Sequence, residues 1–233
     1  MFVRKMFVHI PKNAGMTIRR SPQLRDKIIL STPAVHKNQA YTNGVLNQMN
    51  KIGDHHGFEH ARWRDLNPAM TSGHEAFAIV RNPWDRVASR YFFAQKVIYH
   101  EEDSDHYGEE DYCDCSSFEA FLEERHKWGG MKYMWHRAIR GWYPAYDYVT
   151  NKQGKIKCDI LRFEDLENEL KRYFKIPTMS GPRNVTGINK GSYQDIYTDE
   201  TIQIVADWYK QDIDTWGFDF DTPAQKNYWR LTQ

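Results

Sequence analysis

The first segment that could do chemistry follows an apolar run near the start of the chain. Residues 6–10 (MFVHI) give way to residues 11–17 (PKNAGMT) and then to residues 18–20 (IRR). A buried strand, a tight loop and a helix start in this order favour an anion cradle, because the first helical turn offers unpaired N–H groups and partial positive charge. Lys12 adds a full charge, and Thr17 can donate a further hydrogen bond. The segment predicts a site for a phosphate or a group of similar shape.

A second strand-to-helix corner also ends in a cation. Residues 76–80 (AFAIV) lead into Arg81, and residues 82–83 (NP) suit the cap and first turn of a helix. Ser89 lies about two helical turns further on, where its hydroxyl could share one ligand with the Arg81 guanidinium. An arginine fork beside a hydroxyl is a good phosphate holder. The alternative is an ion pair between Arg81 and Asp85, with Arg86 and Arg90 on a solvated face of the helix.

The elements that must position these corners alternate along the chain. Apolar runs predict strands at residues 6–10, 27–30, 76–80 and 157–161. The segments that predict helices are residues 17–20, 40–49, 85–94, 117–124, 163–173 and 198–216. This alternation is typical of an α/β fold with a central parallel sheet flanked by helices, and the length suits a single domain over residues 1–233. Ligands bind beyond the carboxyl ends of such strands, so both corners should grip one ligand with two separated anionic groups.

Composition limits the partners. The 32 Lys and Arg residues balance 31 Asp and Glu residues, so we expect no nucleic-acid partner. No apolar stretch reaches the roughly 18 residues of a membrane span, and Cys113, Cys115 and Cys158 form no paired framework, so we expect a soluble cytoplasmic protein without a membrane partner. The acidic residues 101–111 predict a surface loop or a partly ordered lid.

Taken together, the two corners resemble the sulfotransferases that use 3′-phosphoadenosine 5′-phosphosulfate (PAPS), particularly the carbohydrate O-sulfotransferase branch. Residues 11–17 are similar to the family's PK-T-A/G-G-T-S loop, a P-loop-like element that holds the 5′-phosphosulfate. Residues 81–89 (RNPWDRVAS) correspond at every fixed position to R-N/D-P-x-x-R-x-x-S, the 3′-phosphate element. Residues 160–166 and 188–220 resemble later family segments.

The resemblance implies a set of donor contacts and a reaction. The donor-binding residues would be Lys12, Asn13, Ala14, Gly15, Met16, Thr17, Arg81, Ser89, Lys190 and Tyr193. Asn13 and Met16 stand where the family usually has threonines, so some hydrogen bonds would come from backbone N–H groups instead. The reaction would be in-line sulfuryl transfer to a hydroxyl acceptor, with 3′-phosphoadenosine 5′-phosphate as product. The branch resemblance favours a saccharide acceptor, and a tyrosine hydroxyl or a small lipid or metabolite alcohol remains open. Without an anchor, a microbial or viral form is expected.

Sulfuryl transfer to an alcohol needs positive charge at the leaving oxygen and a base for the hydroxyl proton. Lys12 would supply the charge. Related carbohydrate sulfotransferases use a histidine or glutamate upstream of the second anion element, and here residues 54–62 read DHHGFEHAR. We rank His60 first as base, ahead of His56 and Glu59, with His74 as a further candidate.

Histidines also have other uses. His56 and His60 are four residues apart and could share a metal ion on one helix face, but no third ligand of suitable spacing is evident, so we expect no metal. Surface histidines without a role remain an alternative. His9 falls within the first predicted strand, where a core histidine with satisfied hydrogen bonds is expected.

Two other function classes remain open. A phosphotransferase also uses a strand, a phosphate loop and a helix, but its loop would read G-x-x-x-x-G-K-[ST]. Here Lys12 precedes Gly15, and no GK[ST] occurs. A non-catalytic nucleotide- or glycan-binding module is the other alternative. For a saccharide, the residues that could form a stacking floor are Trp128, Tyr133, Trp135, Trp142 and Tyr143.

Overall fold

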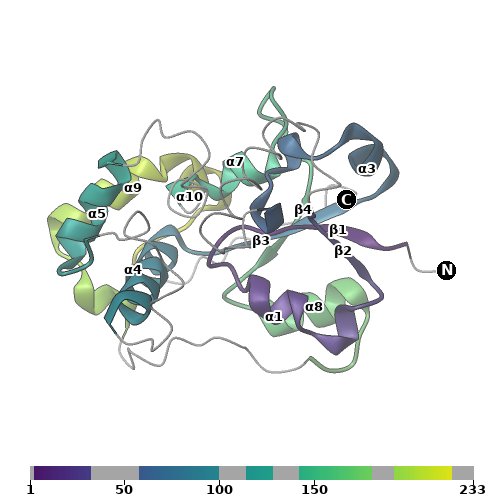
Figure 1. Cartoon of the computed structure of the whole chain (residues 1–233), viewed down its shortest axis with the longest axis horizontal. Coiled ribbons are helices and arrows are strands. Elements are labelled where there is room, and N and C mark those ends of the chain that lie inside the picture. The colour runs from purple at the N-terminus through teal and green to yellow at the C-terminus, as the bar shows by residue number, and fades with distance from the viewer. Residues whose placement is uncertain (1–2, 33–57, 100–113, 128–141, 180–191, 222–233) are drawn as a thin grey trace.

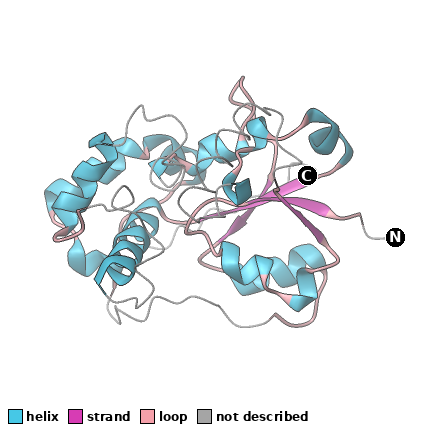
Figure 2. Cartoon of the chain, in the orientation of Figure 1, coloured by secondary structure: helices cyan, strands magenta, loops and turns pink. Residues whose placement is uncertain are grey.

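The computed structural model describes residues 3–32, 58–99, 114–127, 142–179 and 192–221. Within these ranges, four parallel strands form one sheet in the order β2-β1-β3-β4. The strands are β1 (Lys5–Val8), β2 (Ile28–Leu30), β3 (Ala76–Val80) and β4 (Asp159–Arg162). Figure 2 shows them side by side with helices around them. The predicted α/β fold is confirmed, and each strand lies within two residues of its predicted bounds.

Helices follow the strands in chain order. They are α1 (Gly15–Arg19), α3 (Pro68–Gly73), α4 (Pro83–Tyr99), α5 (Phe118–Lys127), α7 (Ala145–Val149), α8 (Leu166–Phe174), α9 (Asp199–Trp208) and α10 (Lys210–Trp216). Short 3₁₀ turns occur at Pro22–Leu24, Phe58–His60, Trp63–Asp65 and Tyr193–Ile196. The helix predicted at 40–49 and the acidic segment 101–111 lie outside the described residues.

Two helix predictions need correction, and two described helices were not predicted. The single helix predicted at 198–216 is divided into α9 and α10 by Tyr209, whose φ of −113° and ψ of 20° are not helical. The helix predicted from residue 163 begins only at Leu166, because the N–H of Phe163 still donates to the carbonyl of Val80 across the sheet (2.8 Å). The helices α3 and α7 were not predicted at all, since six and five residues are too few for a clear apolar period.

The sheet is buried on both faces, which explains why its strands read as continuous apolar runs. Successive side chains point to opposite faces, so Phe7 and Phe77 enter the core beneath α1 and α8, whereas Met6 and Ala78 enter the core on the other face. In Figure 1, α1 and α8 lie together on one side of the sheet, and α7 and α10 lie on the other. Both predicted corners therefore follow strands that are packed against the core on both faces of the sheet.

The start of α4 is fixed by the predicted cap. The Asn82 side-chain oxygen accepts hydrogen bonds from the backbone N–H groups of Trp84 (3.0 Å) and Asp85 (3.4 Å). Pro83 takes the first helical position, where a missing N–H costs nothing. The helix thus begins directly after Arg81, at the carboxyl end of β3. None of the described helices is long and apolar enough to cross a membrane.

Candidate functional site

The loop between β1 and α1 has an unusual backbone that side chains hold in place. Lys12 and Ala14 adopt left-handed conformations, with φ of 66° and 60°. The buried Asn13 between them donates from its side-chain amide to the carbonyl of Ile79 in β3 (2.7 Å). A Cβ on Gly15 would overlap the imidazole of His9, so only glycine fits there. Asn13 therefore ties the loop to the sheet, a role that its place in the sequence motif does not reveal.

Lys12 sits in a strongly positive environment. Its Nζ lies 4.1 Å from the centre of the Phe93 ring. Burial, together with the nearby charges of Arg81, Arg90 and Lys96, lowers the pKa of Lys12 to about 7. A bound anion would offset these positive charges around Lys12. The surroundings of the loop therefore have the positive charge that the predicted anion site requires.

Arg81 connects the two corners. Its Nη1 donates to the backbone oxygen of Lys12 (2.8 Å), so the second corner contacts the first directly. Its Nε and Nη2 form a fork with the two Asp85 carboxylate oxygens, each at 2.7 Å. The guanidinium also stacks on Phe163, 4.1 Å from the ring centre. The alternative ion pair with Asp85 is therefore present, and it leaves Arg81 beside Lys12.

Arg86 is a structural cation of the same segment. Although charged, it is only 1% exposed. Its Nε donates to the carbonyl of Pro11 (3.1 Å) and its Nη1 to the carbonyl of Tyr143 (2.8 Å). The interpretation that placed Arg86 on a solvated face is wrong. Its buried neighbours Val87 and Ala88 were the sequence signal that could have placed it inside.

The other residues predicted to bind the sulfuryl donor differ in burial and in their hydrogen bonds. Ser89 is half-buried on α4. Thr17 is buried within α1, while Met16 is half-buried. Tyr193 reaches the second corner: its hydroxyl donates to the carbonyl of Phe220 (2.5 Å) and lies 3.5 Å from the Asn82 amide. Lys190 lies outside the described residues.

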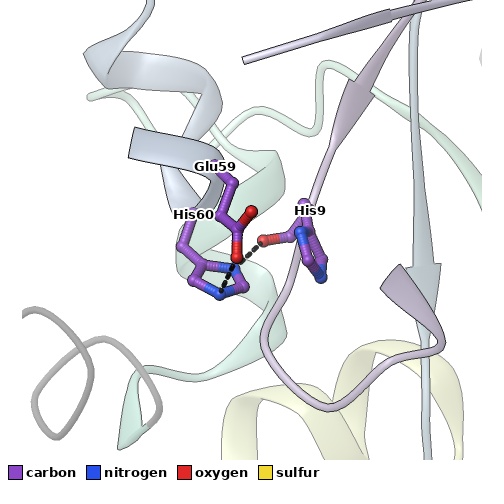
Figure 3. A group of neighbouring side chains, drawn as sticks. All are labelled: His9, Glu59 and His60. Atoms are coloured by element: carbon purple, nitrogen blue, oxygen red, sulfur yellow. Dashed lines mark hydrogen bonds and ion pairs between the residues drawn. The ribbon is translucent and has the colours of Figure 1, made fainter. Parts of the chain in front are cut away.

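His60 and Glu59 lie against the end of β1 (Figure 3). The Nδ1 of His60 is 3.0 Å from the carbonyl oxygen of His9, and since a carbonyl only accepts, Nδ1 carries the proton. In a neutral ring, Nε2 is then the proton acceptor, and it lies 3.5 Å from Glu59 Oε1. Glu59 also pairs with Arg19 of α1. The first-ranked base thus has the tautomer that a base needs.

His9 completes this group. It is buried as expected, with its ring centre 4.2 Å from that of His60. Burial, with a smaller contribution from Arg19, lowers the pKa of His9 to about 3, so its ring is neutral. The expectation of satisfied hydrogen bonds is wrong, because the buried Nδ1 has no hydrogen-bond partner among the described residues.

Of the other predicted candidates that the structure describes, His74 and Trp142 do not join this group. His74 bonds through Nδ1 to the carbonyl of Met70 (3.1 Å), just before β3 begins, whereas Arg81 follows the opposite end of that strand. His56 lies outside the described residues, as do Trp128, Tyr133 and Trp135. Trp142 is 5% exposed and packs on Phe121, so it is a core residue and forms no open stacking floor.

Comparison with known proteins identifies a family. The family model described as "Sulfotransferase family" matches residues 6–219, a range that contains both cationic corners, the His60 segment and the strand β4. No curated protein sequence matches the chain. Because the family match covers most of its length, the chain belongs to the sulfotransferase family.

Proposed function

We propose that this protein transfers a sulfuryl group from PAPS to the hydroxyl of a carbohydrate acceptor. One observation carries the proposal: Arg81 donates to the backbone of Lys12, so the two cationic corners are in direct contact beyond the carboxyl ends of β1 and β3. A ligand with anionic groups at two points suits such a surface. PAPS carries a 3′-phosphate and a 5′-phosphosulfate, and the family membership supports sulfuryl transfer.

Each corner would take one end of the donor. Lys12 and the backbone of the loop would hold the 5′-phosphosulfate, and Lys12 would stay charged there because the anion offsets its cationic neighbours. Arg81 and Ser89 would hold the 3′-phosphate. Arg81 must then exchange at least part of its fork with Asp85 for phosphate oxygens, since Asp85 occupies two of its donors.

His60 would act as the base. Its Nε2 would take the acceptor's hydroxyl proton while that oxygen forms a bond to sulfur and the bond from sulfur to the bridging phosphate oxygen breaks. Lys12 would stabilise the charge that grows on the departing oxygen. The products are a sulfate ester, 3′-phosphoadenosine 5′-phosphate and a protonated His60, which returns its proton to solvent.

The test is release of 3′-phosphoadenosine 5′-phosphate from PAPS during incubation with a panel of saccharide, phenol and small alcohol acceptors. We expect a saccharide to accelerate release well above the rate with water alone. Acceleration only by a phenol or small alcohol would refute the carbohydrate acceptor but would still support sulfuryl transfer from PAPS. If PAPS binds but no acceptor accelerates product release, the result would refute the enzyme and support a non-catalytic binding module. Transfer from ATP that requires Mg²⁺ would favour a phosphotransferase instead.

A further inference from the structure

Three side chains with metal-binding atoms converge beside the anion loop. One ligand atom from each of His9, Glu59 and His60 lies within 4.8 Å of the other two. Figure 3 shows the Glu59 carboxylate and the His60 ring facing His9, which follows the strand β1. The third ligand that sequence spacing did not reveal for His60 therefore comes from a segment about 50 residues earlier in the chain. Two imidazoles and one carboxylate are a common zinc ligand set.

The imidazoles are already prepared to bind a cation. The proton on His60 Nδ1 is directed at the His9 carbonyl oxygen (3.0 Å), so the lone pair of Nε2 is on the side of Glu59. A backbone carbonyl in this position is the usual outer partner of a metal-binding histidine, because it fixes both the tautomer and the ring orientation. His9 has a buried ring nitrogen, Nδ1, with no hydrogen-bond partner in the described part of the chain. Such an atom gains most from a ligand.

Charges around the group decide which ion it suits. Glu59 carries the negative charge, and the ion pair with Arg19 uses its Oε2, while its Oε1 faces His60. A carboxylate has enough lone pairs to keep Arg19 on one oxygen and bind a metal with the other. Mg²⁺ and Ca²⁺ prefer mostly oxygen ligands, whereas Zn²⁺ and Co²⁺ accept imidazole nitrogen. The ligand set therefore favours the zinc class, and the Arg19 charge limits its affinity.

We propose that His9, Glu59 and His60 bind a divalent ion of the zinc class, and that the bound ion inhibits the protein. Inhibition follows because the metal takes the Nε2 lone pair that His60 would use to accept a proton. Only this second statement rests on the proposed function; the binding site stands on the three side chains alone.

Binding is tested without donor or acceptor. Chelator-treated protein is titrated with Co²⁺, whose visible absorption reports its ligands, and Zn²⁺ is then added in competition. We expect one Co²⁺ per chain at this site, displaced by Zn²⁺, and affinity at least about tenfold weaker in Glu59→Gln and His60→Asn. The matched control His74→Asn removes a histidine outside the group and should bind as the wild type does.

His9 is examined in the wild-type protein, because it packs against Gly15 and a variant could fail to fold. Bound Co²⁺ should strongly shift the ring-proton resonances of His9 and His60 and leave those of His74 unmoved. Absence of Co²⁺ binding, or binding that is unchanged in both Glu59→Gln and His60→Asn, would refute the site and place any metal elsewhere.

Inhibition is measured separately, as the ratio of transfer rates with and without Zn²⁺ in the same preparation. We expect a strong decrease in the wild type that excess chelator reverses, and a weaker decrease in Glu59→Gln. A rate unaffected by Zn²⁺ at concentrations that fill the site would refute the inhibitory role. Metal binding in a protein that transfers no sulfuryl group would refute the proposed function and keep the metal site.

Discussion

Arg81 donates a hydrogen bond from Nη1 to the backbone carbonyl oxygen of Lys12 over 2.8 Å, although the two residues are 69 positions apart. The contact joins the loop after β1 to the corner after β3, and these strands are neighbours in the sheet. A parallel pair brings its carboxyl ends to the same edge. The contact brings the two cationic corners together, and the following predictions test the proposal that a doubly anionic nucleotide binds across them.

Arg81→Ala should weaken binding of 3′-phosphoadenosine 5′-phosphate by roughly 1.5–3 kcal/mol, as expected when a charge-assisted hydrogen bond is lost. Isothermal titration calorimetry measures the affinity directly. Arg172→Ala is the control, because that arginine is 61% exposed on α8. Affinity equal to that of the wild type would remove Arg81 from the 3′-phosphate.

Asp85→Asn should tighten binding of the same nucleotide by about threefold to tenfold, equivalent to roughly 0.7–1.4 kcal/mol. The reason is that Asp85 holds Arg81 through two hydrogen bonds and places a negative charge beside the expected phosphate. Competition with a fluorescent nucleotide gives the ratio of dissociation constants. Weaker binding by a normally folded Asp85→Asn protein would mean that Asp85 orients Arg81 for the ligand and does not compete with it.

The pH dependence of nucleotide binding should follow Lys12. Burial, assisted by Arg81, Arg90 and Lys96, lowers its pKa to about 7, so Lys12 of the free protein is charged below pH 7 and neutral above it. An anion prefers the charged form, and affinity should therefore fall above pH 7, by at most about tenfold per pH unit. Lys12→Met should bind more weakly at pH 6 and show little decrease between pH 7 and 9. An equally steep decrease in Lys12→Met would assign the titration to another group.

The same pKa has a consequence for stability. Between about pH 7 and the ordinary lysine pKa of 10.5, the unfolded chain binds a proton at Lys12 that the folded protein does not. Lys12 therefore makes the free energy of unfolding rise with pH in this window, and the contribution is absent in Lys12→Met.

His60→Ala should reduce transfer by at least about a hundredfold and leave nucleotide affinity unchanged, because a base contributes to the chemical step and not to donor binding. Rates of product release at saturating donor, together with calorimetric affinities, separate the two effects. A near-normal rate would move the base to Glu59 or to His56.

Gly15→Ala should destabilise the protein by about 1–3 kcal/mol, since the new methyl group overlaps the His9 ring and the loop must shift. Chemical denaturation measures the free energy of unfolding. Gly73→Ala is the matched control, because a Cβ at Gly73 has no atom within 4 Å, and its effect should stay within about 0.5 kcal/mol. Equal free energies of unfolding for the two variants would show that the loop shifts to accept the methyl group without loss of stability.

The strands were predictable because burial on both faces leaves an uninterrupted apolar run in the sequence. Residues 76–80 were predicted with the same bounds that β3 has. Helix boundaries were less predictable where a tertiary contact decides them. Tyr209 divides α9 from α10 while its hydroxyl donates to the carbonyl of Trp142 (3.0 Å), and no local pattern contains that contact.

The sequence by itself determined which residue types follow which strand: a lysine loop after the first and an arginine corner after the third, in the order of a sulfotransferase. These are local properties, carried by adjacent residues. Only the tertiary structure decided that Arg81 bonds to the Lys12 backbone, that Arg86 is a buried support, and that His9 faces His60 and Glu59. Such pairings depend on strand order and on side-chain packing between distant segments. The spacing of residues along the sequence does not reveal them, because it does not show which segments become neighbours in the fold.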